Sequence, residues 1–119
     1  MNAYEVSKTL TTMAFAGKDG TVDSWDQPLP EAGFYVGGVR PSLVYKDVNH
    51  VDRSDLAWFI GGTEARYFGV WVDSEDGQIY FDAVTHVEKL QDAVALGNER
   101  EEVAIWDIAE NEEVRLQDA

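Results

Sequence analysis

The second half of the chain contains two runs rich in aromatic and β-branched residues, at about 67–73 and 78–84. Runs of this length and composition, bounded by turn residues, are typical of strands. Asp76 and Gly77 lie between the runs, and this dipeptide favours a tight turn because glycine adopts a positive φ without strain. The pattern therefore predicts a β-hairpin.

A helix and a further pair of strands are predicted after the hairpin. The segment 86–98 has apolar residues at helical spacing, and Gly97 stands where a left-handed residue would end the helix. The segment 102–108 is apolar at its centre and predicts a strand, which we expect to pair with 112–116 across a turn at 109–111. The expected buried face of the helix comprises Val87, Leu90, Ala93 and Val94.

The middle of the chain predicts two short strands and a helix. Residues 34–36 and 43–45 are β-prone, and the glycines and proline between them interrupt what we expect to be a strand pair. The segment 53–62 predicts a helix with Ser54 as its N-cap, ended by the two glycines at 61–62.

The first 32 residues are less regular. Residues 1–15 fit either a short helix or an irregular arm. Residues 16–32 are rich in Gly, Asp, Ser and Pro, which predicts a loop. We expect Trp25, within that loop, to cover the core as a plug.

Together these elements predict an α+β protein with a mostly antiparallel sheet, two or three helices on one face, and a C-terminal half in the order ββαβ. The 119 residues suffice for one core. We therefore expect a single domain over 1–119. It would consist of an N-terminal arm and loop (1–32), a strand pair and helix (33–66), and the hairpin, helix and strands of 67–119.

Charge is distributed unevenly along this chain. It has 23 acidic and 9 basic residues and a net charge of −14. Residues 1–72 hold nine acids and six bases, a net charge of −3, whereas residues 73–119 hold fourteen acids and three bases, a net charge of −11. Direct nucleic-acid binding is disfavoured, because contacts to phosphates need clustered Lys and Arg.

Composition excludes other classes as well. The chain has no cysteine, so disulfides and thiolate metal sites are excluded. No apolar run reaches the length of a membrane span, and the first residues lack the pattern of a secretory signal. We therefore expect a cytoplasmic protein.

Candidate catalytic residues are few. Asp47, His50 and Asp52 lie close together, but a zinc or iron site needs three or four converging ligands, so we interpret this segment as a solvated loop. We expect His86 to have a capping or surface role at a strand–helix junction. Nucleophile-elbow, phosphate-loop and dinucleotide motifs are missing, and the turn after Asp73 fails the spacing of an EF-hand. We expect no enzyme, no cofactor and no metal.

The acids of the second half are the main candidates for a binding surface, since Glu and Asp are unfavourable strand residues and like charges on neighbouring positions repel. If the elements that carry them share a side, the carboxylates form a negative stripe with a spacing comparable to that of DNA phosphates. The alternative is a surface that is simply acidic and serves solubility. The candidate partner-binding residues are Asp73, Glu75, Asp76, Glu88, Asp92, Glu99, Glu101, Glu102, Asp107, Glu110, Glu112 and Glu113.

A sequence pattern within 67–107 resembles part of a known family. The pattern is Gly-x-Trp-x-Asp followed by Glu-x-Ala-Ile-x-Asp, and its residues are Gly69, Trp71, Asp73, Glu102, Ala104, Ile105 and Asp107. It is similar to the N-terminal part of ArdA-type antirestriction proteins, and the whole half resembles small uncharacterised acidic proteins of actinobacteria and their phages. The first resemblance implies an acidic DNA mimic, although this chain is shorter and lacks the repeated domains of that family. We expect Trp71 and Trp106 to be core aromatics.

Two functional hypotheses follow. The first is a non-enzymatic acidic inhibitor from a phage or mobile element, which binds the basic, nucleic-acid-binding surface of a host protein as anti-restriction and anti-CRISPR proteins do. A homodimer would lengthen its stripe and is left open. The second is an adaptor or structural accessory protein that recognises its partner through aromatic residues. Its expected contact residues are Tyr35, Tyr45, Trp58 and Tyr67.

Overall fold

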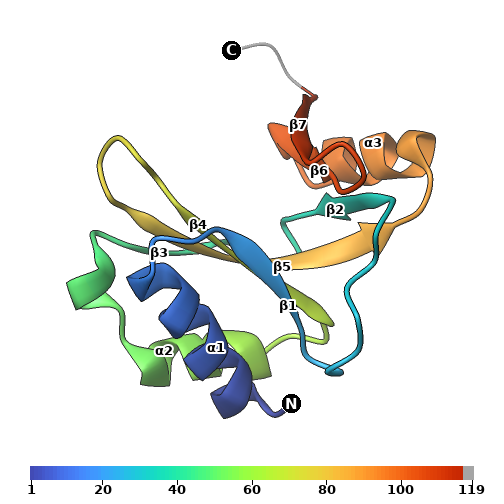
Figure 1. The fold of residues 1–119 in the computed structure, drawn as a ribbon. Coiled ribbons are helices and arrows are strands. Elements are labelled where there is room, and N and C mark those ends of the chain that lie inside the picture. The colour runs from blue at the N-terminus through green and yellow to red at the C-terminus, as the bar shows by residue number, and fades with distance from the viewer. Residues whose placement is uncertain (117–119) are drawn as a thin grey trace.

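The computed structural model describes residues 1–116, which form three α-helices and a seven-stranded antiparallel sheet (Figure 1). The expected α+β class is confirmed. Among the residues described, no helix is long and apolar enough to cross a membrane. In chain order the elements are α1 (Ala3–Phe15), β1 (Gly20–Asp23), β2 (Phe34–Val36), β3 (Leu43–Tyr45), the 3-10 helix η1 (Val48–His50), α2 (Arg53–Gly61), β4 (Tyr67–Val72), β5 (Ile79–Val87), α3 (Leu90–Glu99), β6 (Ala104–Asp107) and β7 (Glu112–Arg115).

Strand β5 organises the sheet. Its residues 79–84 pair with β4 across the predicted hairpin, and residues 85–87 pair with β2. The order across the sheet is β1-β4-β5-β2-β6-β7, and β3 pairs with residues 79–81 of β5. The expected pairing of 34–36 with 43–45 is wrong. Both strands run antiparallel to β5, so the chain keeps its direction between them instead of reversing.

All three helices cover one face of this sheet, as expected. Ile79 and Phe81 of β5 pack with α1 and α2 in the main core. Val87 and Ile105 pack with α3 in a second core at the other end of the sheet. Val87, expected in the helix, is the last residue of β5 and has the same parity along that strand as Ile79. Side chains of equal parity share a face, so both cores lie on the same side.

The N-terminal segment is a helix followed by a strand. Asn2 caps α1: its side chain accepts a hydrogen bond from the Glu5 amide, and the Glu5 carboxylate accepts one from the Asn2 amide. Val6 and Leu10, one turn apart, are buried against the sheet. Strand β1 lies inside the segment 16–32, for which we expected only a loop. It forms because β4 offers it a free edge, a non-local contact that loop composition does not indicate.

Helix α2 begins two residues earlier than its expected cap implies. The N-cap is Asp52, whose carboxylate accepts hydrogen bonds from the amides of Ser54 and Asp55, so the prediction of Ser54 is wrong. The helix ends at the predicted glycines, with Gly62 as its C-cap.

Helix α3 continues through the glycine that was expected to end it. Gly97 is buried, and a Cβ there would lie 2.4 Å from Leu116 Cδ1 and 3.1 Å from Ile105 Cγ2. Gly97 therefore provides close packing against the last strands, and the left-handed residue is Glu101, with φ of 59°. Leu90, expected in the buried face, is 51% exposed.

Candidate binding cleft

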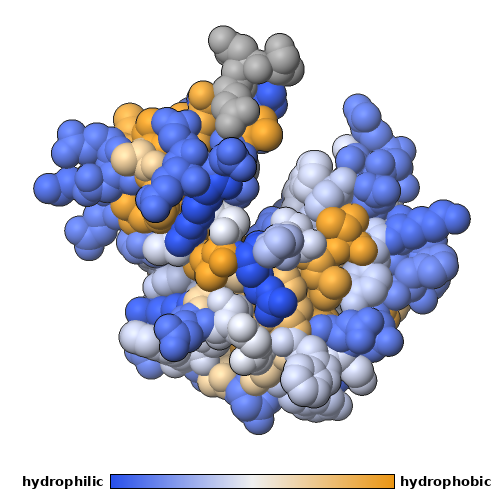
Figure 2. All heavy atoms as spheres, turned by 180° about the vertical axis from the view of Figure 1, so that it is seen from behind, coloured by the Kyte–Doolittle hydropathy of each residue, from blue (hydrophilic) through white to orange (hydrophobic). Residues whose placement is uncertain are grey.

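The face of the sheet opposite the helices is open and concave. By strand register it carries Thr21 of β1, Gly69 of β4 and Asp82 of β5. The sheet curls, so the β4–β5 hairpin and the β6–β7 hairpin stand on either side of a cleft of about 430 Å³. Figure 2 views the molecule from the side opposite to Figure 1. It shows apolar residues at the base of a deep hollow between two lobes with largely hydrophilic surfaces.

Two tryptophans line the walls of this cleft. Trp71 of β4 is 48% exposed and lies against Tyr80, with ring centroids 4.9 Å apart. Trp106 of β6 is 41% exposed and lies opposite Tyr35 of β2 in the sheet. The expectation that both tryptophans are core aromatics is wrong. The neighbours Val70 and Ile105 occupy the helix-covered face, and the alternation of side chains along each strand places both indoles on the other face.

Asp82 lies in the lining of the cleft, near the middle of β5. It is half-buried, and the Ser42 hydroxyl donates a hydrogen bond to its carboxylate. Burial raises the pKa of Asp82, and the bond from Ser42 opposes that shift. This environment destabilises the ionised form of the Asp82 carboxylate. A positively charged ligand beside it would stabilise that form.

A second carboxylate, Glu102, lies at the end of the cleft where the chain enters β6. Burial and the nearby charge of Asp82 both raise its pKa, while Arg100 lowers it. Its side chain passes close to the backbone of Gly37, where a Cβ would lie 2.5 Å from Glu102 Oε1. The glycines between β2 and β3 therefore make room for this carboxylate.

Gly69 differs from Gly37, because neither a close contact nor a positive φ requires a glycine at position 69. A Cβ there would lie 3.6 Å from the Gly20 carbonyl oxygen, an ordinary contact. Glycine within a strand costs about 0.5–1 kcal/mol relative to alanine. The absence of a side chain at this position keeps the cleft open.

Arg100 fixes the position of one wall. Its guanidinium donates hydrogen bonds to the carbonyls of Val36 and Gly37, at 3.1 and 3.0 Å, and to the Thr85 hydroxyl at 3.1 Å. These bonds tie the end of α3 to β2 and β5, and they set where the following strand β6 begins.

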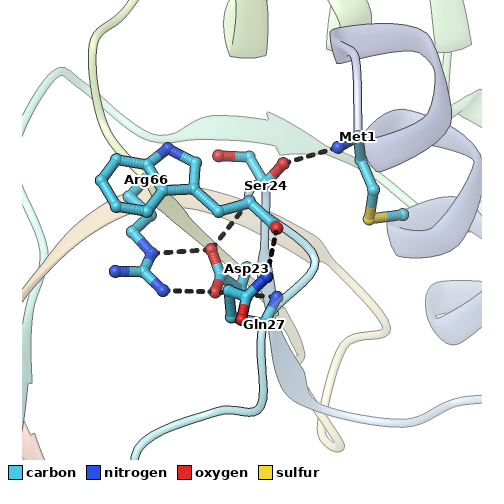
Figure 3. Close-up of polar contacts among 6 residues, drawn as sticks. Met1, Asp23, Ser24, Gln27 and Arg66 are labelled. Atoms are coloured by element: carbon cyan, nitrogen blue, oxygen red, sulfur yellow. Dashed lines mark hydrogen bonds and ion pairs between the residues drawn. The ribbon is translucent and has the colours of Figure 1, made fainter.

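At one end of the same face, Asp23 and Arg66 form an ion pair (Figure 3). Asp23 is 4% exposed and accepts two hydrogen bonds from the Arg66 guanidinium, at 2.9 and 2.8 Å, as well as bonds from the amides of Trp25 and Gln27. The guanidinium lies 4.1 Å from the Trp25 ring centroid and 4.9 Å from that of Tyr67. Trp25 is 64% exposed and covers this arginine, so its predicted role as a plug over the core is wrong.

Arg66 lowers the pKa of Asp23 through these hydrogen bonds, against the opposing effect of burial. The neighbouring Tyr35 has its pKa raised to about 12, chiefly by burial. The N-terminal ammonium adds a further tie here, donating a hydrogen bond to the Ser24 carbonyl at 2.8 Å. The cluster fastens the loop after β1 to the start of β4.

The candidate acidic residues are distributed over both lobes, but Asp92 and Glu99 belong to α3, on the face of the sheet opposite the cleft. Asp73, Glu75 and Asp76 occupy the turn of the β4–β5 hairpin, and the others extend from the end of β5 to β7. Glu102 and Glu113 line the cleft itself. Nine of the twelve are exposed: Glu75, Asp76, Glu88, Asp92, Glu99, Glu101, Glu110, Glu112 and Glu113.

The histidines and their neighbours make structural contacts. His50 Nδ1 lies 2.8 Å from Asp47 Oδ1, while Asp52 caps α2. Within residues 1–116, no group of three potential metal ligands converges. His86 Nε2 lies 2.9 Å from the Ala32 carbonyl oxygen, and its ring packs edge-on against Tyr35.

The aromatic residues expected as an adaptor surface are mostly not presented to solvent. Tyr35 and Tyr67 are buried and pack on each other, with ring centroids 5.7 Å apart. Tyr45 is half-buried and donates its hydroxyl hydrogen to the Asp52 carbonyl. Of the four, only Trp58 is well exposed, at 81%.

Comparison with known proteins identifies no relative: no protein-family model, no curated protein and no solved structure matches this chain.

Replacing Asp23 with asparagine should lower the free energy of unfolding by about 1–2 kcal/mol near neutral pH, because charge-assisted hydrogen bonds are lost. The pKa of Asp23 is lower in the folded chain than in the unfolded chain, where it is about 4. The stabilisation is therefore complete above that value and disappears as pH falls through the folded-state pKa. Urea denaturation at several pH values would measure this. The exposed Asp26→Asn should have little effect, and an equal loss in both variants would contradict the role of the pair.

Replacing Asp82 with asparagine should raise the urea midpoint near neutral pH. The pKa of Asp82 is raised in the folded state, so its ionised form destabilises the fold above the unfolded value and the neutral amide does not. The gain should vanish in acid, where the carboxyl group is protonated in both states. The exposed Glu31→Gln is the control, with a midpoint close to that of the wild type. A lower midpoint for Asp82→Asn at neutral pH would show that the bond from Ser42 needs the charge.

Proposed function

We propose that this protein is a non-enzymatic inhibitor that binds a basic, nucleic-acid-binding surface of another protein and blocks it. Anti-restriction and anti-CRISPR proteins of phages and mobile elements act in this way. The observation that carries the proposal is the placement of exposed carboxylates on both lobes of the cleft, with three basic residues from 73 to 116 to offset them.

Electrostatics gives such a surface a natural class of partner. Proteins that handle nucleic acids present clustered Lys and Arg to phosphates, and an acidic surface is attracted to the same cluster. Complementary charge accelerates encounter and suppresses binding to partners of the wrong sign. The acids of this chain would occupy the path of the nucleic acid, and the resemblance of 67–107 to ArdA-type DNA mimics is consistent with that role. Such partners are cytoplasmic, so we propose that this protein acts there.

The second candidate is an adaptor that binds through aromatic residues. It is favoured by the exposure of Trp71 and Trp106 in the cleft, since tryptophan is enriched among residues that dominate interface energies. The two candidates differ in their dependence on salt. Contacts between charges on a surface weaken as salt screens them, whereas apolar contacts do not.

Substitution of the three acids at the β6–β7 turn, Glu110→Gln, Glu112→Gln and Glu113→Gln together, should weaken binding to a captured partner at least tenfold. The reason is the loss of three negative charges from one lobe. The same net change made elsewhere, by Asp26→Asn, Glu31→Gln and Glu64→Gln, is the matched control and should have a much smaller effect.

The experiment is capture from host lysate with the purified protein, followed by elution with increasing salt or with duplex DNA. A nucleic-acid enzyme that both salt and duplex DNA release would support the proposal. A partner that is retained in high salt and is indifferent to DNA would support the aromatic adaptor instead.

A further inference from the structure

The lining of the cleft has acidic and aromatic side chains but no basic one. Sixteen described residues line it, and none of them is Lys or Arg. Trp71 and Trp106 add aromatic surface on both walls, and the base is partly apolar (Figure 2). A neutral sugar would not need this many negative charges, and an anion would be repelled by them. The four carboxylates of the lining are Asp19, Asp82, Glu102 and Glu113.

The same face of the sheet already holds one guanidinium with a comparable set of groups. Arg66 is paired with Asp23 (Figure 3) and lies against the rings of Trp25 and Tyr67. Carboxylate pairing and aromatic stacking are the two interactions that distinguish guanidinium from ammonium, because its planar fork suits both. This chain therefore stabilises an arginine of its own with a carboxylate and an indole on its concave face.

The lining of the cleft also combines a carboxylate with an indole, but it contains no arginine. Asp82 lies in the lining, and Trp71 stands two residues along β4 from Gly69, the register partner of Asp82. Tyr80 packs on the Trp71 indole, with ring centroids 4.9 Å apart, and so adds a second ring beside this indole. Gly69 lines the cleft next to Asp82 and carries no side chain that would occupy it.

We propose that this cleft binds an arginine side chain of the partner protein, with its guanidinium paired with Asp82 and stacked on the tryptophans of the walls. The nature of the partner, a protein with a basic surface, rests on the proposed function, while the arginine site itself rests on the geometry of the cleft. A volume of about 430 Å³ admits one long side chain with part of its backbone rather than a folded element.

Short capped peptides test the site without knowledge of the partner. Three peptides are needed that differ at one central residue, which is arginine, lysine or citrulline, the neutral analogue of arginine with nearly the same shape. Calorimetric titration into the full chain at low salt would give the dissociation constants. We expect the arginine peptide to bind at least fivefold more tightly than the lysine peptide, and the citrulline peptide not to bind measurably.

Variants locate the binding. Asp82→Asn and Trp71→Ala should each weaken binding of the arginine peptide at least fivefold, because each removes one of the two interactions. Gly69→Val should abolish it by filling the cleft while leaving the charge unchanged, and a Cβ at this position makes only an ordinary contact, 3.6 Å from the Gly20 carbonyl oxygen. Trp58→Ala and Glu31→Gln, on exposed positions away from the cleft, should bind like the wild type. Circular dichroism confirms that each variant is folded.

The outcomes separate this inference from the proposed function. Equal binding of the arginine and lysine peptides, with equal losses in Asp82→Asn and Glu31→Gln, would overturn the site and leave a diffuse acidic surface, as the proposed function needs. Absence of any binding by the arginine peptide at millimolar concentration would also overturn it. Selective, Gly69→Val-sensitive binding of arginine would uphold the site even if the lysate experiment captured no nucleic-acid enzyme.

Discussion

The strict alternation of side chains along β5 determines the layout of the molecule. Ile79 and Phe81 point to the helices, and Asp82 points to the cleft. Because β2, β3 and β4 all pair with this one strand, the face to which each β5 side chain points also determines the face of its register partners in those strands. A shift of one residue would place a carboxylate in the core and an apolar row in water, so the register is held firmly. One face is covered by helices and the other carries the cleft.

Three arginines of this chain make contacts that hold the fold together. Arg66 closes the ion pair with Asp23, Arg100 bonds to three groups of β2 and β5, and Arg40 donates to the Phe59 carbonyl at 2.9 Å. These arginines therefore fix elements of the fold. The carboxylates of the surface are partly offset by the exposed basic residues Lys8, Lys18, Lys46, Lys89 and Arg115.

Local patterns predicted elements well, because turn residues and periodicity act over a few neighbours: the hairpin at 67–84 and the strand pair at its C-terminal side are confirmed. Pairing of distant segments was predicted poorly. Strand β1 exists only because β4 has an edge to fill, and β2 and β3 join β5 rather than each other. For the site, charge pointed to Glu102 and Glu113, but Asp82 and the exposure of Trp71 required a known register, which composition cannot supply.

The sheet ends at β1 and β7, and among residues 1–116 no further strand covers either of these edges. An uncovered edge offers free amide and carbonyl groups to any second strand, including that of another copy. Strand β7 presents Glu112 and Glu113 at that edge together with Arg115, which pairs with Glu113 at 3.2 Å, so its net charge is negative. The net negative charge of the whole chain, which keeps copies apart, vanishes at the isoelectric point of about 4.2. A solution near that pH is therefore the condition in which edge-to-edge stacking of the sheets becomes accessible.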